Sequence, residues 1–250
     1  MRFIQLPDYE GKRSYTATVT ANAPDNRIGA DQEITVLITD VDDSAPLWES
    51  SRSFSVAENQ TSIGTVTATD ADGDTVSYSL SGTDASSMSI NSSSGVLTFN
   101  SAPDYETKTS YTATVTATDG TNSTNQNITV NVTNLNDNTP AITSSSSFSV
   151  NENQTAIGTI TATDADGDTL SYSLSGTDSS SMTINSSSGV LSFSDPPDYE
   201  TKTSYAVTIS TNDGNNTATQ AISISILNVS PPSEIASISA GSGALNARAS

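Results

Sequence analysis

Apolar and polar residues alternate over short stretches along most of this chain. Val66 and Ala68 alternate with threonines, and the stretch 111–117 alternates in the same way. Because successive side chains of a β-strand point to opposite faces, a period of two predicts strands with one buried face. No period of 3.6 residues, as in a helix, is visible. Turn pairs such as Asp-Gly and Ser-Gly separate the stretches, which predicts strands at 54–56, 64–69, 76–80, 88–90, 96–99, 111–118 and 128–132.

The sequence contains an internal repeat. Residues 54–99 recur with few changes as residues 148–193, an offset of 94 positions (148 minus 54). A partial copy stands at the start, where residues 34–46 match 128–140 and the loop before them is two residues longer than its counterpart. We therefore divide the chain into the C-terminal part of a repeat (1–46), two whole repeats (47–140 and 141–230) and a linker or tail (231–250).

The number of strands per repeat predicts the fold class. About seven short alternating strands per unit are typical of an immunoglobulin-like sandwich. Hydrophobic residues make up only 33% of the chain, which suits small cores in several thin domains. We expect an all-β chain of tandem immunoglobulin-like, Greek-key β-sandwiches.

Composition excludes several function classes. The net charge is −20, and nucleic acid or an anionic membrane would repel such a polyanion. The chain has no Cys and no His, which removes disulfides, zinc sites and most nucleophilic and general-base catalysis. The oxygen ligands that remain suit hard cations such as Ca²⁺. We predict no enzyme activity, no nucleic-acid partner and no membrane insertion by this segment.

The acidic residues are concentrated where strands end. Alternation places Asp70 one step beyond the buried positions 66 and 68, and Asp119 follows 111–117 in the same way. A carboxylate inside the core would be costly, but at the end of a strand it reaches the end of the sandwich. Like charges gathered there repel one another, and a divalent cation would reverse that repulsion. A merely solvated acidic surface, as in a halotolerant protein, is the alternative.

These motifs, taken in order, resemble a cadherin repeat of the type found in large bacterial surface proteins. The family has a Glu near the first strand, an Asp-x-Asp pair after the second and a triplet such as Asp104-Tyr105-Glu106. It also has an Asp-Gly pair after the sixth strand and a linker followed by Pro, as in 134–140. The resemblance covers residues 1–230, and it implies a cadherin-type sandwich that binds Ca²⁺ beside each linker.

The resemblance implies two sets of calcium ligands. The set for the first linker comprises Asp8, Glu10, Asp40, Asp42, Asp43, Asp70, Asp72 and Asp119. The set for the second linker comprises Glu58, Asp104, Glu106, Asn136, Asp137, Asn138, Asp164, Asp166 and Asp213. Asn134 stands where the family has an acid, so the second linker could hold fewer ions. The linker after 141–230 has no acids, so we expect little or no calcium beside Glu152, Asp198 and Glu200.

Two features admit a second interpretation. The run 70–74 resembles an EF-hand loop, but Thr75 and Ser81 occupy the positions where that loop requires Gly and Glu. Trp48 could be a swapped tryptophan like those of adhesive cadherins, but it aligns with Ile142 and is better explained as an apolar residue of the first strand.

We therefore expect an extracellular, cell-surface rod that serves as an adhesive element or spacer, with Ca²⁺ stiffening the joints between neighbouring repeats. Homophilic contacts and contacts with surface glycans or proteins are the partners left open. The alternatives are bead domains of a fibre or virion component and a carbohydrate-binding module. Aromatic residues are only 6% of the chain, which argues against the last.

Overall fold

The computed structural model describes residues 2–21 and 30–229. The chain separates into two compact units, Met1–Leu135 (unit 1) and Asn136–Ser250 (unit 2). The expected tail at 231–250 and the longer loop of the partial copy lie outside the described residues.

Each unit contains a sandwich of short strands, as the alternation predicts. The strands of the unit 1 sandwich are β3 (Leu47–Trp48), β4 (Ser53–Ala57), β5 (Ser62–Thr65), β6 (Ala68–Thr69), β7 (Ser77–Ser81), β8 (Met88–Ile90), β9 (Val96–Phe99), β10 (Ser110–Thr118) and β11 (Ser123–Thr133). Those of unit 2 are β12 (Ala141–Ile142), β13 (Ser147–Asn151), β14 (Ala156–Thr159), β15 (Ala162–Thr163), β16 (Ser171–Ser175), β17 (Met182–Ile184), β18 (Val190–Phe193), β19 (Ser204–Asn212) and β20 (Thr217–Leu227). Two 3-10 turns, η1 (Ala85–Ser87) and η2 (Ser179–Ser181), precede β8 and β17.

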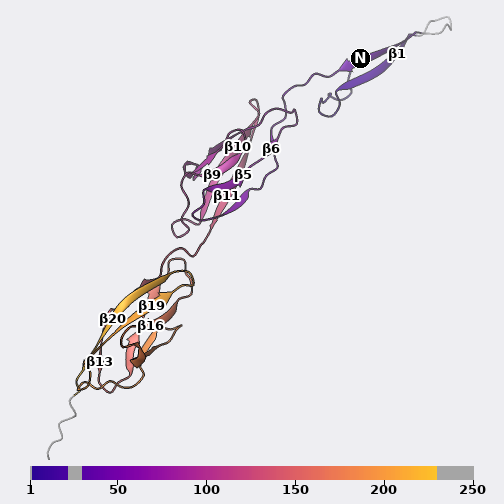
Figure 1. Ribbon diagram of the computed structural model, residues 1–250. Helices are drawn as coiled ribbons and strands as arrows, with labels where there is room; N and C mark the ends of the chain where they lie inside the picture. The colour runs from indigo at the N-terminus through magenta and orange to yellow at the C-terminus, as the bar shows by residue number, and fades with distance from the viewer. Residues whose placement is uncertain (1, 22–29, 230–250) are drawn as a thin grey trace, which may run out of the picture. The chain divides into compact units, whose positions relative to one another are not determined.

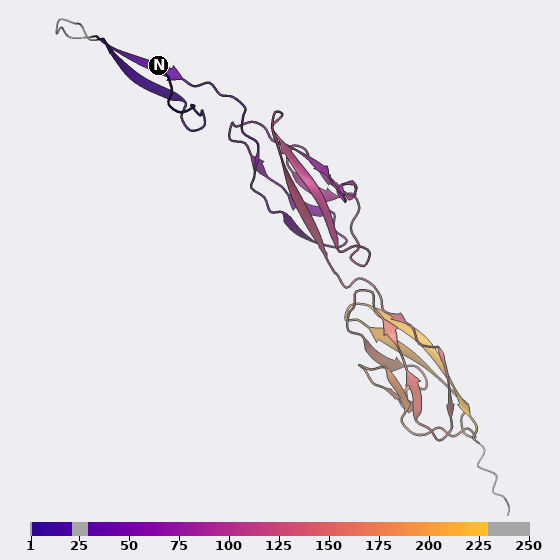
Figure 2. The same ribbon diagram turned by 180° about the vertical axis from the view of Figure 1, so that it is seen from behind.

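The two layers of the unit 1 sandwich are sheets of different size. One sheet has the order β4-β11-β10-β7, and the facing strands form the sheets β5-β9-β8 and β3-β6. The long hairpin of β10 and β11 runs along the body of this sandwich (Figure 1). β4 pairs with β11 in parallel. Its neighbours in sequence, β3 and β5, pair antiparallel with β6 and β9. Unit 2 repeats this topology, with β13-β20-β19-β16 as its larger sheet. Figure 2 shows the ribbons of both sandwiches from behind, with the strands of unit 2 coloured from salmon to yellow.

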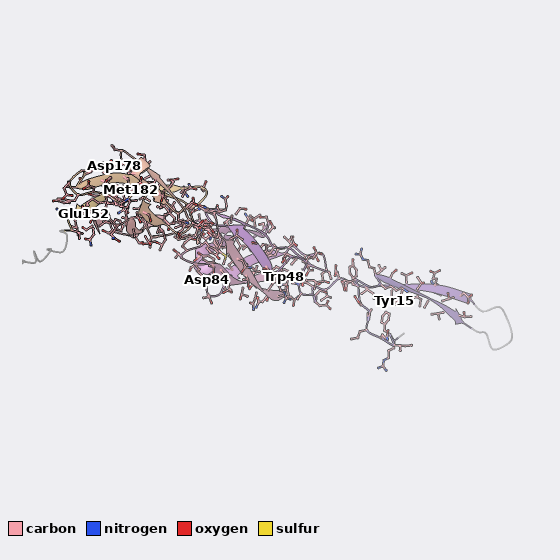
Figure 3. The ribbon with its side chains drawn as sticks, turned by 90° about the horizontal axis from the view of Figure 1, so that it is seen from below. Tyr15, Trp48, Asp84, Glu152, Asp178 and Met182 are labelled. Carbon is pink, nitrogen blue, oxygen red and sulfur yellow. The ribbon has the colours of Figure 1, made fainter. Side chains whose placement is uncertain are left out.

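Alternation also decides which side chains form the core. Along β10 the residues Ala113, Val115 and Ala117 are buried, and the threonines between them face outward. They pack against apolar residues of the opposite layer such as Leu97 and Phe99. The interpretation of Trp48 as a first-strand residue is confirmed, because it lies in β3 and packs against this core (Figure 3).

Two predicted strands have different bounds in the structure. The stretch 64–69 is interrupted, because the N–H of Val66 donates to the carbonyl of Gly95 while β6 pairs with β3. The stretch 128–132 is only the second half of β11. The first half, Ser-Thr-Asn-Gln-Asn, has little strand propensity and is held by five of the nine consecutive pairings with β10.

The partial copy at the start of unit 1 forms a two-stranded hairpin of β1 (Ser14–Ala21) and β2 (Ala30–Leu37). It corresponds to β10 and β11 in sequence. Its apolar side chains Val19 and Ile34 are exposed, whereas the equivalent Val115 and Ile128 are buried. Leu37 is also exposed, and its equivalent is the exposed Asn131. Tyr15 lies on this hairpin (Figure 3) and stacks edge-on against Phe3, with ring centroids 5.1 Å apart.

Candidate metal centres

Three carboxylates meet at one end of the unit 1 sandwich. Asp70 and Asp72 follow β6, and Asp119 follows β10. One oxygen of Asp70 accepts the N–H of Asp72 at 3.0 Å, and one oxygen of Asp119 accepts the N–H groups of Thr121 and Asn122 at 2.7 and 2.6 Å. These turns fix the carboxylates in place without using their second oxygens.

The remaining oxygens of this group are buried and lack hydrogen-bond donors. Among the described residues, Asp70 Oδ2, Asp72 Oδ1 and Asp119 Oδ2 have no partner. A buried, unpaired carboxylate oxygen costs free energy comparable to a lost hydrogen bond or more. Several such atoms on neighbouring strand ends are the arrangement that a hard cation with oxygen ligands stabilises.

The first linker lies against these carboxylates. Asp72 Oδ2 accepts the N–H groups of Asp43 and Ser44 at 3.1 and 2.9 Å. The side-chain amide of Asn122 donates to Asp42 Oδ1 at 3.1 Å and to the Ser44 carbonyl at 3.3 Å. The backbone and the acids of the linker are therefore held next to the strand ends.

Further acids join this end of unit 1. Carboxylate oxygens of Glu10, Asp40 and Asp72 lie within 4.8 Å of one another, and so do oxygens of Asp42, Asp72 and Asp74. Burial raises the pKa of Asp74, and the negative charges of Asp42, Asp70, Asp72 and Asp119 raise it further. This region of like charge is the electrostatic setting in which a divalent cation binds.

The opposite end of the unit 1 sandwich has a different arrangement. Glu58 follows β4 and is only 1% exposed. Its oxygens accept the N–H of Tyr105 at 2.8 Å and the N–H of Leu135 at 2.7 Å. Asp104 accepts the N–H of Glu106 at 3.0 Å and the hydroxyl of Thr107 at 2.8 Å. Glu58 thus joins the end of β4 to the loop at 104–106 and to the chain after β11.

Unit 2 repeats the first arrangement at the end where β15 and β19 finish. Oxygens of Asp164, Asp166 and Asp168 lie within 4.8 Å of one another. Asp213 is 7% exposed, and its Oδ1 accepts the N–H groups of Asn215 and Asn216 at 2.7 and 2.6 Å. Asp164 Oδ2 and Asp213 Oδ2 are buried and find no donor in the described part of the chain.

The pKa shifts in unit 2 follow from these contacts. Burial raises the pKa of Asp213, but the hydrogen bonds from Asn216 and Asn215 outweigh it and hold the pKa below its usual value. No hydrogen bond contributes to the pKa shift of Asp168. Burial and the charges of Asp164, Asp166 and Asp213 raise its pKa. The hydrogen bonds therefore favour the ionised form of Asp213, whereas the surroundings of Asp168 disfavour its ionised form.

The second linker is held in the same way as the first. Asp166 Oδ2 accepts the N–H groups of Asp137 and Asn138 at 3.1 and 2.9 Å. The side-chain amide of Asn216 donates to Asn136 Oδ1 at 3.2 Å and to the Asn138 carbonyl at 3.1 Å.

The remaining predicted ligands differ in their surroundings. Asp8 accepts N–H groups of its own turn, from Glu10 at 3.2 Å and from Gly11 at 3.3 Å. Asp43 contributes its backbone N–H to Asp72, as given above. At the other end of unit 2, oxygens of Glu152, Asp198 and Glu200 lie within 4.8 Å of one another. Glu152 accepts the N–H of Val229 at 2.7 Å, and Figure 3 places it near one end of this sandwich.

Sequence reasoning missed the two asparagines that hold the linkers. Asn122 and Asn216 stand three residues after Asp119 and Asp213, in the runs Asp-Gly-Thr-Asn and Asp-Gly-Asn-Asn. Their repetition at the same offset in both copies was the available signal. Asp74 and Asp168, the third acids of their loops, were also left out of the predicted ligand sets.

The family model of the cadherin domain matches residues 52–133 and 146–227, which together make up more than half of the chain. The chain belongs to the cadherin family. Its matched segments are therefore tandem cadherin domains, and the expected fold class and family resemblance are confirmed. Cadherin repeats are adhesive or structural modules without catalytic activity, and the cadherin ectodomains that match here are extracellular.

Solved cadherin ectodomains share the fold. A structure of mouse cadherin-23 EC22-24 is 25% identical, with 90% of this chain and 78% of that chain covered and a TM-score of 0.72. Protocadherin gamma B2 domains 3-6 and the protocadherin gammaB7 EC3-6 cis-dimer structure are each 25% identical, with TM-scores of 0.74 and 0.76. They cover 90% and 87% of this chain, which spans 63% and 61% of theirs.

The chain spans less than two thirds of the two protocadherin chains. How those protocadherins assemble is therefore at most a proposal for this chain. No curated protein matches the chain. Within the described residues, no helix has the length and apolar character that a membrane span requires.

Proposed function

We propose that this chain is a calcium-binding segment of an extracellular cadherin rod that acts as an adhesive element or spacer. Calcium would bind beside each of the two linkers and restrict the motion of neighbouring repeats. The observation that carries the proposal is the set of buried carboxylate oxygens without donors on Asp70, Asp72 and Asp119, repeated on Asp164 and Asp213.

The donor set fits Ca²⁺. The residues supply carboxylate, amide and backbone carbonyl oxygens, without nitrogen or sulfur ligands, and Ca²⁺ takes six to eight such oxygens in flexible geometry. In unit 1 the ligands would come from Asp70, Asp72, Asp119, Glu10 and the linker acids Asp40 and Asp42. When bound, the ion would supply positive charge that offsets their mutual repulsion.

In unit 2 the ligands would come from Asp164, Asp166, Asp213 and the linker residues 136–138. Participation of Glu58, Asp104 and Glu106 stays a prediction of the family resemblance. So does the expectation of little or no calcium beside Glu152, Asp198 and Glu200.

A calcium-dependent melt tests the proposal in unit 1. The chain has a single Trp, and Trp48 packs in the unit 1 core, so its emission follows unfolding of that unit alone. A free Ca²⁺ concentration ten times the Kd stabilises the folded state by about 1.4 kcal/mol per site. For a domain of this size that raises Tm by roughly 6–11 °C.

Two isosteric variants give this test its control. Asp119→Asn removes a predicted ligand and should abolish most of the calcium-dependent rise in Tm. Asp84→Asn removes an acid that pairs with Lys108 on the side of the sandwich, so it should lower Tm and leave the calcium-dependent rise intact. A Trp48 melt that is identical in EDTA and in millimolar Ca²⁺ would refute the proposal.

A further inference from the structure

Hydrogen bonds hold both linkers against the sandwich that follows them. In each unit one asparagine has a double role. The backbone N–H of Asn216 donates to Asp213 Oδ1, while its side-chain amide donates to the linker at Asn136 and Asn138. Asn122 does the same between Asp119 and the first linker.

The second linker has additional contacts that the first lacks among the described residues. Asn138 Nδ2 donates to Asp166 Oδ1 at 2.9 Å, and Asn136 Nδ2 donates to the Asp213 carbonyl at 3.3 Å. The amide of Asn215 donates to the Asn136 carbonyl at 2.8 Å. One linker amide thus donates to a carboxylate of the sandwich, and two further amide hydrogen bonds end on backbone carbonyls.

The first linker places acids where the second places amides. Asp42 takes the position of Asn136, and it lies in one acid group with Asp72 and Asp74. Asp40 takes the position of Asn134 and lies in a second acid group with Asp72, whereas in the second linker Asp137 is the acid that lies in a group with Asp166. Among the described residues, like-charge repulsion therefore opposes docking of the first linker through two of its acids and of the second through one, and the second linker has the additional amide hydrogen bonds.

We infer that Asn122 and Asn216 are positioning residues that hold the linkers against the following sandwich. We infer further that Asn216 and the additional amide bonds keep the second linker docked without calcium, whereas Asn122 alone does not suffice for the first linker, which docks fully only with calcium. The inference about docking does not require the proposed function. The expected effect of docking on calcium affinity does rest on the proposed function. A site whose linker is already docked binds more tightly, because apparent affinity is reduced by the fraction of molecules in which the site is formed.

Amide hydrogen exchange measured by NMR on the full 250-residue chain in EDTA tests the docking. The reporters are the N–H groups that the linkers donate to Asp166 and Asp72, namely those of Asp137, Asn138, Asp43 and Ser44. We expect exchange at 137 and 138 to be slower than at 43 and 44. Asn216→Ala should speed exchange at 137 and 138 about tenfold, because its side chain supplies two ordinary hydrogen bonds.

A matched variant separates docking from general stability. Asn185→Ala also removes two hydrogen bonds in unit 2, which the N–H groups of Ser187 and Ser188 donate to Asn185 Oδ1, but these bonds lie within the turn between β17 and β18. It should lower Tm and leave exchange at 137 and 138 unchanged. The inference is overturned if Asn216→Ala has no effect on these amides, or if Asn185→Ala speeds them equally.

Calcium titration of the same samples tests the effect on affinity. In Asn216→Ala, slow exchange at 137 and 138 should return with added Ca²⁺, at a midpoint about three to ten times higher than in the unsubstituted chain. An unchanged midpoint overturns this part. If calcium alters no amide in the unsubstituted chain, the proposed function fails, while the comparison in EDTA still decides the docking.

Discussion

Replacing Glu58 tests how much of the stability of unit 1 depends on one buried carboxylate. Glu58 is 1% exposed and accepts two backbone N–H groups, from Tyr105 at 2.8 Å and from Leu135 at 2.7 Å. Glu58→Ala would leave both donors without a partner. Hydrogen bonds to a charged acceptor contribute about 1.5–3 kcal/mol each, so the pair amounts to roughly 3–6 kcal/mol.

Part of that free energy offsets the cost of burying the charge. The expected net loss in EDTA is therefore near the lower limit, about 3 kcal/mol. With a urea m-value of about 1–3 kcal/mol/M, the midpoint of unfolding should fall by roughly 1–3 M. Glu58→Gln keeps one acceptor and turns an amide N–H₂ toward the other donor, so about half the loss is expected.

Urea unfolding followed by Trp48 emission measures the effect, because this residue reports on unit 1 only. Glu152→Ala is the matched control, since Glu152 accepts the N–H groups of Tyr199 and Val229 at the equivalent place in unit 2. It should leave the Trp48 transition unchanged and lower a far-UV transition of unit 2. A Trp48 midpoint within about 0.3 M of the original in Glu58→Ala, below the smallest shift the m-value allows, would refute the reasoning.

Two further predictions concern a glycine and an ion pair of unit 1. Gly95→Ala should destabilise unit 1 by more than 2 kcal/mol, because Gly95 has φ +69° and the added Cβ would lie 2.1 Å from the Val66 carbonyl oxygen. Gly73→Ala, at φ +88° with nothing within 4 Å, should cost only about 1 kcal/mol in the same Trp48 assay, and equal losses would contradict the steric argument. The hydrogen bond from Lys108 holds the pKa of Asp84 below its ordinary value of 3.8. The stability advantage over Asp84→Asn should therefore be complete above pH 4 and fade as pH falls through the lowered pKa. A constant advantage from pH 7 to pH 2 would show that the ion pair is not its source.

The sequence alone was sufficient for the strand pattern and for the acids at the strand ends. Side-chain direction in a strand depends only on position parity, so Val66, Ala68 and Asp70 could be placed without any tertiary information. The repeat then showed that the acids recur at equivalent positions, which made a cation site the expectation before any contact was known.

Only the tertiary structure decided the pairings between distant segments. The parallel pairing of β4 with β11, and the bonds from Asn122 to Asp42 and Ser44, join residues about eighty positions apart. Within a single copy, nothing local distinguishes Asn122 from the many other asparagines of the chain, because its role depends on where the linker returns. The unpaired oxygens of Asp164 and Asp213 likewise become visible only when every neighbouring donor has been placed.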